Sequence, residues 1–328
     1  MRFTTYNLYN LFASESAEDR KHYETVVAAI RSVDSDVLAV QEILAPDGPA
    51  AAGRLRQLAH DVGLRCEVPG PAGRQAALAV GGHGYHVGLM WRDGIEPVSG
   101  SLRLLGGGGD FWHGLAMVTL DVGGLVRHGS FHATPFGRGL RADQNERLVA
   151  AVTRPQSVPT LIGADWNTES ADRITAAGGS ELYEPADPYA AVEWFADLIY
   201  QCEWDYDEQG RRRHWADRRP GDVLWAGGLH DAAALLRAQW HATAGHHPDD
   251  VYGAHGVRRR IDGVRVTVSA ARAVRAHRVL DTALTQEASD HLPVTVEYEP
   301  AAVEYEPDAA TLWGSYGRNV GLLVLSAS

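Results

Sequence analysis

The chain has 328 residues, with 30 lysines and arginines against 42 aspartates and glutamates, so its formal net charge is −12 with histidine neutral. Hydrophobic residues make up 45% of the chain, which excludes a disordered or collagen-like protein. Cys66 and Cys202 lie far apart without CxxC spacing, so we expect neither a disulfide framework nor a zinc site. The acidic balance gives no general attraction to a polyanion, although a locally basic face remains compatible with it.

Short apolar runs bounded by turn residues predict strands through most of the chain. They lie at residues 3–8, 37–41, 88–91, 116–120, 127–131, 160–163, 265–268 and 292–297. Apolar side chains at helical spacing predict helices at 21–33 and 143–153. Strands mixed with helices in this order predict an α/β (α+β) fold of two stacked sheets with helices outside.

Residues 178–256 interrupt this pattern and are rich in tryptophan and charge, so we interpret them as an elaborated insertion in a domain spanning 1–298. Within the insertion we expect helices at 187–201 and 231–241. Residues 299–328 form a C-terminal tail. The longest apolar runs are too short to span a membrane, and no apolar signal segment precedes the first strand, so we expect a cytoplasmic protein.

Polar residues stand at the ends of the predicted strands, an unusual place for them. They are Asn7, Glu42, His132, Asp165, Asn167, Asp262, Asp290 and His291. Each alone has a structural explanation, such as a turn at Asn7 or a helix cap at Asp165. As a set they hold four carboxylates and no cysteine, which suits Mg²⁺, or alternatively Mn²⁺, and phosphoester cleavage.

The order of these motifs resembles the endonuclease/exonuclease/phosphatase superfamily, which includes DNase I-like nucleases and inositol phosphatases. The matching pieces are Tyr6-Asn7, Gln41-Glu42, His132, Gly163-Ala-Asp-Trp-Asn167, Arg260-Ile-Asp262 and Ser289-Asp-His291. The resemblance implies a DNase I-like four-layer sandwich of two mixed β-sheets flanked by helices, with the site at one edge of the sheets. It also implies a metal-dependent phosphoesterase.

The resemblance also implies roles for the cation ligands and the attacking water. Glu42 would ligate the cation with Asn7 beside it, and Asp290 would bind or position the same ion. Asp165 would orient or deprotonate the water. Where some family nucleases carry a further acidic residue, this chain has Tyr9, so a single cation is the safer expectation.

Further roles concern the phosphate. Asn167 would hold a phosphoryl oxygen, His132 would donate to a non-bridging oxygen, and His291 would act as acid, base or charge stabiliser with Asp262 as its partner. Tyr85 lies where many relatives place a phosphate-contacting tyrosine; an equally good interpretation is an aromatic residue packed at a strand entry.

The substrate is predicted from locally basic stretches at 138–147, 211–219 and 258–260. Arg138 and Arg260 would lie at the rim and bind substrate phosphates. This favours a nuclease or phosphodiesterase acting on nucleic acid by in-line attack of water. One alternative is a phosphatase for a small phosphorylated metabolite, with the Trp-rich insertion as a lid. Another is a binding module without catalysis. For 211–219, solvated arginines balancing nearby acidic residues explain the cluster equally well.

Overall fold

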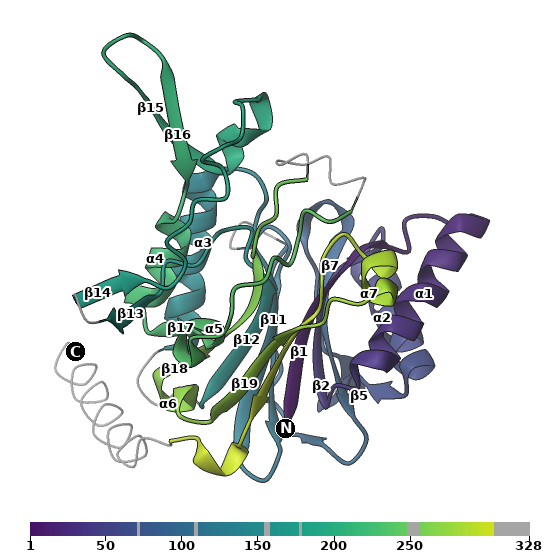
Figure 1. Cartoon of the computed structure of the whole chain (residues 1–328). Helices are drawn as coiled ribbons and strands as arrows, with labels where there is room; N and C mark the ends of the chain where they lie inside the picture. Colours follow the sequence, from purple (N-terminus) through teal and green to yellow (C-terminus); the bar gives the residue numbers. More distant parts are fainter. Residues whose placement is uncertain (71–72, 108–110, 154–157, 177–178, 248–255, 305–328) are drawn as a thin grey trace, which may run out of the picture.

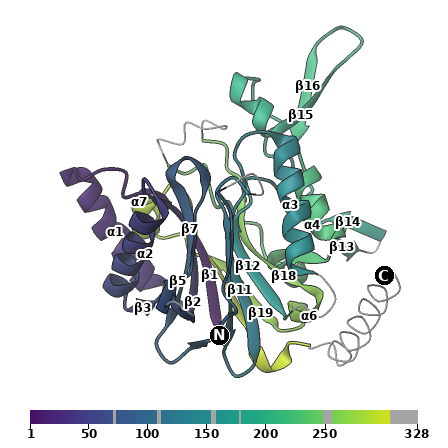
Figure 2. The ribbon, with the colours of Figure 1, turned by 180° about the vertical axis from the view of Figure 1, so that it is seen from behind.

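Figure 1 presents the computed structural model of the chain, which describes all residues except 71–72, 108–110, 154–157, 177–178, 248–255 and 305–328. Two mixed β-sheets stack face to face, and helices cover the outer face of each (Figures 1 and 2). The predicted four-layer sandwich is therefore confirmed.

The first sheet has the strand order β19-β20-β1-β2-β7-β3, with β6 paired to β7. Its strands are β1 (Arg2–Leu11), β2 (Val37–Leu44), β3 (Leu64–Arg65), β6 (Leu78–Ala79), β7 (Tyr85–Arg92), β19 (Val274–Val279) and β20 (Val294–Tyr298). Helices α1 (Ala17–Val33), α2 (Gly48–Val62) and α7 (Ala283–Ala288) lie on its outer face (Figure 1). Because β1 pairs with both β2 and β20, the first and last strands of the fold are neighbours.

The second sheet has the order β17-β18-β12-β11-β10-β8, with β9 paired to β10. Its strands are β8 (Glu96–Pro97), β9 (Arg103–Leu105), β10 (Leu115–Asp121), β11 (Leu125–His132), β12 (Thr160–Asp165), β17 (Leu229–Asp231) and β18 (Asp262–Thr267). Helices α3 (Arg138–Val152) and α4 (Arg219–Ala226) cover its outer face (Figure 2). The short helices α5 (Ala232–Leu236) and α6 (Val268–Ala271) lie beside β17 and β18.

Three apolar clusters hold the layers together. Phe3, Val118 and Val264 belong to the cluster between the sheets, whereas other clusters join each sheet to its helices. Gly163 of β12 lies in the middle of this packing, because an added Cβ would come 2.8 Å from the Thr5 side chain of the facing sheet. Close sheet packing therefore depends on a residue without a side chain at this position.

Helix α2 was not among the sequence predictions, yet its ends carry ordinary signals. The Asp47 side chain accepts the N–H of Ala50, Pro49 stands in the first turn, and Gly63 closes the helix with φ 74°. Three alanines and a glycine near its start weaken the apolar periodicity on which the sequence prediction depends.

The insertion differs from the prediction at both expected helices. Within 187–201 the structure has only the 3₁₀ helix η2 (Ala196–Tyr200), because the Asp187 carboxylate accepts N–H groups of Tyr189 and Ala216 and so ties this segment into a turn. Within 231–241 only α5 forms, because Arg237 adopts a left-handed conformation that ends the helix.

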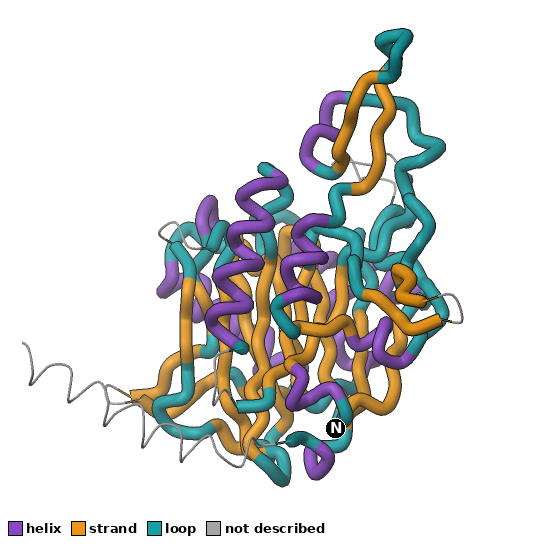
Figure 3. Tube along the Cα trace, turned by 90° about the vertical axis from the view of Figure 1, so that its left-hand side faces the viewer, coloured by secondary structure: helices purple, strands orange, loops and turns teal. Residues whose placement is uncertain are grey.

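Short hairpins complete the structure. They are β4 (Glu67–Gly70) with β5 (Gly73–Ala76), β13 (Arg173–Ala176) with β14 (Gly179–Leu182), and β15 (Cys202–Tyr206) with β16 (Arg212–Ala216). The β15–β16 hairpin stands clear of the sandwich (Figure 3). Two further 3₁₀ turns are η1 (Gly82–Gly84) and η3 (Pro300–Ala302).

The proposed tail from 299 is described only as far as Glu304. Within that stretch Val303 is buried in the cluster between the sheets, and Glu304 N–H donates to the Ser269 carbonyl oxygen. None of the described helices combines the length and hydropathy needed to span a lipid bilayer.

Candidate active site

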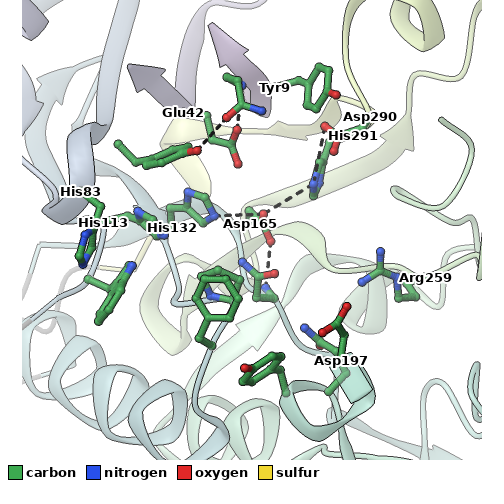
Figure 4. A pocket seen from close by; sticks show the side chains of 18 residues that line it. Tyr9, Glu42, His83, His113, His132, Asp165, Asp197, Arg259, Asp290 and His291 are labelled. Carbon is green, nitrogen blue, oxygen red and sulfur yellow. Dashed lines mark hydrogen bonds and ion pairs between the residues drawn. The ribbon is translucent and has the colours of Figure 1, made fainter. Parts of the chain in front are cut away.

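A pocket of about 510 Å³ opens where the polar strand ends meet (Figure 4). The strand register explains the meeting. His132 at the end of β11 lies opposite Asp165 at the end of β12, which lies opposite Asp262 at the start of β18. In the facing sheet, Asn7 and Glu42 come from the neighbouring parallel strands β1 and β2. Residues distant in sequence therefore share one edge of both sheets.

Asp165 is the centre of the site, and it is almost completely buried. Its Oδ2 lies 3.1 Å from Asn7 Nδ2, 3.3 Å from His132 Nε2 and 3.8 Å from His291 Nε2. Its Oδ1 accepts the N–H of Asn167 at 2.9 Å. Asn7, His132 and the Asn167 N–H thus hold one carboxylate at the pocket wall, and the His291 ring lies at ion-pair distance from it (Figure 4).

His291 is held by contacts on both of its sides. Its Nδ1 lies 2.8 Å from Asp262 Oδ2, as the resemblance implied. Its backbone N–H donates to Ser289 Oγ, and that hydroxyl donates to the Asn7 carbonyl oxygen at 2.8 Å. The last motif of the sequence is therefore bonded to the first.

Charges in the site reinforce one another. Burial opposes ionisation of Asp165, but the charge of His291 and the hydrogen bond from His132 outweigh it, so the pKa of Asp165 lies below its ordinary value. Burial also opposes protonation of His291, yet Asp262 and Asp290 raise its pKa well above the ordinary value. The pKa of His132 is raised by Asp165 against the same effect. These shifts favour an ionised Asp165 and the protonated forms of His132 and His291 around it.

Backbone strain concentrates at this pocket. Of the eight described non-glycine residues with positive φ, five line it. They are Tyr9, Asn10, Glu42, His83 and Asn167. Such conformations cost free energy and persist where the surrounding structure imposes them, typically at functional sites.

The carboxylate oxygens of Glu42 and Asp290 at one edge of the pocket are suitable ligands for a hard divalent cation. Glu42 is oriented by Asn7 Nδ2 at 3.1 Å from Oε1 and by the Asn10 N–H at 2.8 Å from Oε2, and Asp290 lines the same pocket. Each carboxylate oxygen retains a lone pair for a cation. Glu42 and Asp290 therefore fit the predicted metal ligands.

Another group, Asp165, Asp262 and His291, also offers three ligand atoms within 4.8 Å of one another. Here, however, His291 Nδ1 is committed to Asp262, so these atoms form a hydrogen-bonded chain. Asn7 lies beside Glu42, as predicted, and its role as a ligand stays a prediction. Its amide nitrogen points to Glu42 and Asp165, and its amide oxygen accepts the Tyr9 N–H with one lone pair and retains the other.

Asn167 and Tyr85 line the pocket with their polar groups already engaged. Asn167 Nδ2 donates to the Ala133 carbonyl oxygen at 3.0 Å, and the Tyr85 hydroxyl donates to Asn10 Oδ1 at 3.0 Å. Both orient loops around the pocket in this structure.

The two arginines predicted to bind substrate lie elsewhere. Arg260 is buried and forms ion pairs with Glu184 and Asp231, because its side chain points away from the pocket. Arg138 pairs with Glu203 at 2.6 Å and lies over the Trp204 ring, outside the pocket lining. The rim prediction was therefore wrong for Arg260, and its neighbour Arg259 lines the pocket instead.

Several pocket residues were not predicted from the sequence. They are Asn10, His83, Trp112, His113, Phe136, Asp197, Tyr200, Gln201 and Arg259. Three of them come from η2 and the residue after it, in the insertion, whose aromatic content was the only signal in the sequence.

Solved structures with the same fold include enzymes with different substrates. A mannosyl-6-phosphatase of Bacteroides thetaiotaomicron is 15% identical with a TM-score of 0.55, covering 91% of this chain and 99% of that one. D. rerio TDP2 complexed with a single-strand DNA product is 12% identical with a TM-score of 0.55, covering 90% and 97%. A family protein from Leptotrichia buccalis is 13% identical with a TM-score of 0.54, covering 91% and 99%.

At these identities the likeness establishes the fold. A comparison with curated proteins finds no match. The family described as Endonuclease/Exonuclease/phosphatase, whose members are generally phosphoesterases, matches residues 4–291 and so includes every motif from Asn7 to His291. The chain therefore belongs to the Endonuclease/Exonuclease/phosphatase family.

Proposed function

We propose that the chain is a divalent-metal-dependent hydrolase that removes phosphate from a small phosphorylated molecule. The observation that carries this proposal is the Asp165-centred network within a pocket of about 510 Å³, a volume that suits a ligand of metabolite size. A family whose members include a mannosyl-6-phosphatase supports the reaction class.

In this proposal each residue has a distinct task. Glu42 and Asp290 would hold a divalent cation, which would supply charge neutralisation at the phosphoryl group. Asp165, ionised because its pKa is lowered, orients the attacking water. The imidazolium groups of His132 and His291 stabilise the charge that develops on the phosphoryl oxygens, and Asp262 keeps the His291 ring in place.

The state of the arginines supports a small substrate. A long nucleic acid is bound mainly through phosphate contacts to lysine and arginine. Here Arg260 forms a buried ion pair with Asp231 and is not available to a ligand. Arg211 pairs with Asp207, and Arg213 pairs with Asp205. These pairs and the net charge of −12 leave little positive surface for a polymer.

One observation favours a second candidate, a nuclease acting on single strands. Beside the β15–β16 hairpin, Arg212 lies over the Trp194 ring at 4.2 Å and Arg138 over the Trp204 ring at 4.6 Å. Alternating aromatic rings and guanidinium groups are a surface on which bases can stack. TDP2 complexed with a single-strand DNA product is a neighbour of this fold.

The deciding experiment measures phosphate release from a panel of small phosphate esters, and cleavage of plasmid and oligonucleotides, with Mg²⁺, Mn²⁺ or EDTA. We expect release from small esters that EDTA abolishes and that Glu42→Gln lowers by weakening cation binding. Cleavage of oligonucleotides without phosphate release from the small esters would support the nuclease instead. Inactivity on the whole panel with both metals would contradict catalysis and favour a binding module.

A further inference from the structure

The hydrogen-bonded pair of Asp262 and His291 joins two different sheets. Asp262 begins β18 of the second sheet, and His291 stands just before β20 of the first. Among the described strand pairings none joins β18 to β20, since β18 pairs with β12 and β17 while β20 pairs with β1 and β19. Direct strand pairing therefore does not set the 2.8 Å contact between Asp262 Oδ2 and His291 Nδ1.

Residues 243–244, within the insertion, lie between the two segments that carry this pair. Ala244 forms a β-bridge to Arg259 on one side and to His291 on the other. Thr243 is bonded on both sides as well, because its N–H donates to the Arg259 carbonyl oxygen at 2.7 Å and its own carbonyl oxygen accepts the Leu292 N–H at 2.8 Å. The insertion thus supplies a short extended segment that separates the last two motifs of the site by a fixed spacing.

The residues that follow keep this segment close to its neighbours. Gly245 has a φ of 90°, and an added Cβ there would lie 2.1 Å from the Val257 carbonyl oxygen. A side chain at this position would therefore push the segment away. On the other side, His246 Nε2 lies 3.0 Å from the Ser289 carbonyl oxygen. The segment is thus held against both motifs.

The side chain of Thr243 holds the start of β18 directly. The residue is fully buried, and its Oγ1 accepts two backbone N–H groups, from Ile261 at 3.1 Å and from Asp262 at 3.0 Å. These bonds use both lone pairs of the hydroxyl oxygen and leave its hydrogen for donation. Burial raises the pKa of the Asp262 carboxyl, and the Thr243 hydroxyl is among the groups that oppose this rise. One hydroxyl therefore acts on both the backbone and the side chain of Asp262.

We infer that Thr243 is a positioning residue, whose hydroxyl fixes the start of β18 so that the Asp262 carboxylate meets His291 Nδ1. The consequence for catalysis rests on the proposed function, because it is exerted through His291. Thr243 itself is outside the pocket lining, so its loss should change turnover rather than substrate binding.

The first test replaces the hydroxyl by a methyl group of similar size in Thr243→Val. We expect kcat to fall about 10²-fold, the effect of misplacing a reacting group by about 1 Å, while KM stays close to the wild-type value. Thr243→Ser retains the hydroxyl and should restore most of the activity. Steady-state kinetics with an ester that the wild-type protein hydrolyses in Mg²⁺ measure all three proteins.

A second readout does not depend on turnover. The ring N–H of His291 that donates to Asp262 should give a low-field proton resonance, which is assigned by its loss in His291→Gln. Thr243→Val should shift or broaden this resonance, whereas Thr243→Ser should retain it. If the wild-type protein hydrolyses no ester, the proposed function fails, and the resonance still tests the hold of Thr243 on the pair.

Thr267, at the opposite end of β18, provides a matched control. It is 4% exposed, and its Oγ1 accepts the Thr160 N–H at 3.0 Å. Thr267→Val should lower the melting temperature but leave kcat and the His291 resonance unchanged. Should Thr243→Val not fold, Thr243→Ser and Thr243→Ala, which differ only in the hydroxyl, give the same comparison.

Three results would overturn the inference. The first is an equal loss of kcat in Thr243→Val and Thr267→Val. The second is a Thr243→Val protein with the kcat and the resonance of the wild type. The third is a wild-type protein without the resonance, since the bond between Asp262 and His291 would then be missing.

Discussion

Two regions that bury charge can be compared, the candidate active-site pocket and an ion-pair cluster formed by Asp172, Glu184, Asp231, Arg260 and Arg265. In the cluster, guanidinium groups face carboxylates directly. Arg260 pairs with Glu184 and Asp231, and Arg265 Nη1 lies 2.7 Å from Asp172. The pocket is lined by four carboxylates and four histidines but by a single arginine, and five of its residues hold positive φ.

The charged groups of the ion-pair cluster stabilise the fold, whereas those of the pocket are placed where a ligand could bind. Asp172 accepts the backbone N–H of Asp231, and Arg260 pairs with Glu184 and Asp231, so the ion-pair cluster joins the insertion to residues on either side of it in the sequence. Matched buried pairs of this kind need no outside partner. The pocket instead carries backbone strain and carboxylates with free lone pairs, features that are typical of functional sites.

The largest expected effect follows from changing the centre of the pocket. Asp165→Asn removes the charge that holds both imidazolium groups and orients water, so kcat should fall about 10²–10⁴-fold. The new amide also loses the charge that faces the Asn7 and His132 donors, so the melting temperature should fall, and kcat is compared at a temperature at which both proteins are folded. Steady-state kinetics and thermal unfolding measure the two quantities. A kcat within tenfold of the wild type would refute the central role of Asp165.

The next effect concerns the ion-pair cluster. Arg260→Met leaves Glu184 and Asp231 buried without their cation, which should lower the free energy of unfolding by about 3–5 kcal/mol. The control is Arg213→Ala, since its pair with Asp205 is exposed and should contribute far less to stability. Urea unfolding measures both. Equal losses would show that burial does not distinguish the two ion pairs.

The third effect depends on pH and on Glu169, a buried carboxyl near the ion-pair cluster. Burial and the charge of Glu184 raise its pKa from 4.5 to about 8. Below about pH 4.5 both folded and unfolded states hold the proton. As the pH rises toward 8, only the unfolded state releases it, so stability is lost by up to about 1.4 kcal/mol per pH unit.

Glu169→Gln keeps the neutral form at every pH. Its stability should match the wild type near pH 5 and exceed it near pH 9, as measured by urea unfolding across that range. Parallel pH profiles for the two proteins would contradict a protonated Glu169 in the folded state.

The core strands could be predicted from the sequence because apolar runs between turn residues depend on local order. The polar strand ends could also be predicted as one site, since parallel neighbours such as β1 and β2 bring their ends together. The insertion could not. Its turn at Asp187 depends on a bond to Ala216, a partner 29 residues away that no periodicity reveals.

The adjacent residues Arg259 and Arg260 illustrate the other limit. In extended backbone, successive side chains point to opposite sides, so one of them reaches the pocket and the other reaches the ion-pair cluster. The sequence of three successive arginines does not indicate which of them lines the pocket. The place of His113 in the pocket could not be predicted either, because it depends on stacking against His132 rather than on its neighbours in the sequence.

The bond from Ser289 to Asn7 and the pairing of β20 with β1 have a consequence for synthesis. A nascent polypeptide must extend past β20 before the pocket can form, because β1 and β20 are neighbours in the same sheet. Proteolytic removal of β20 from a finished molecule should therefore dismantle the pocket.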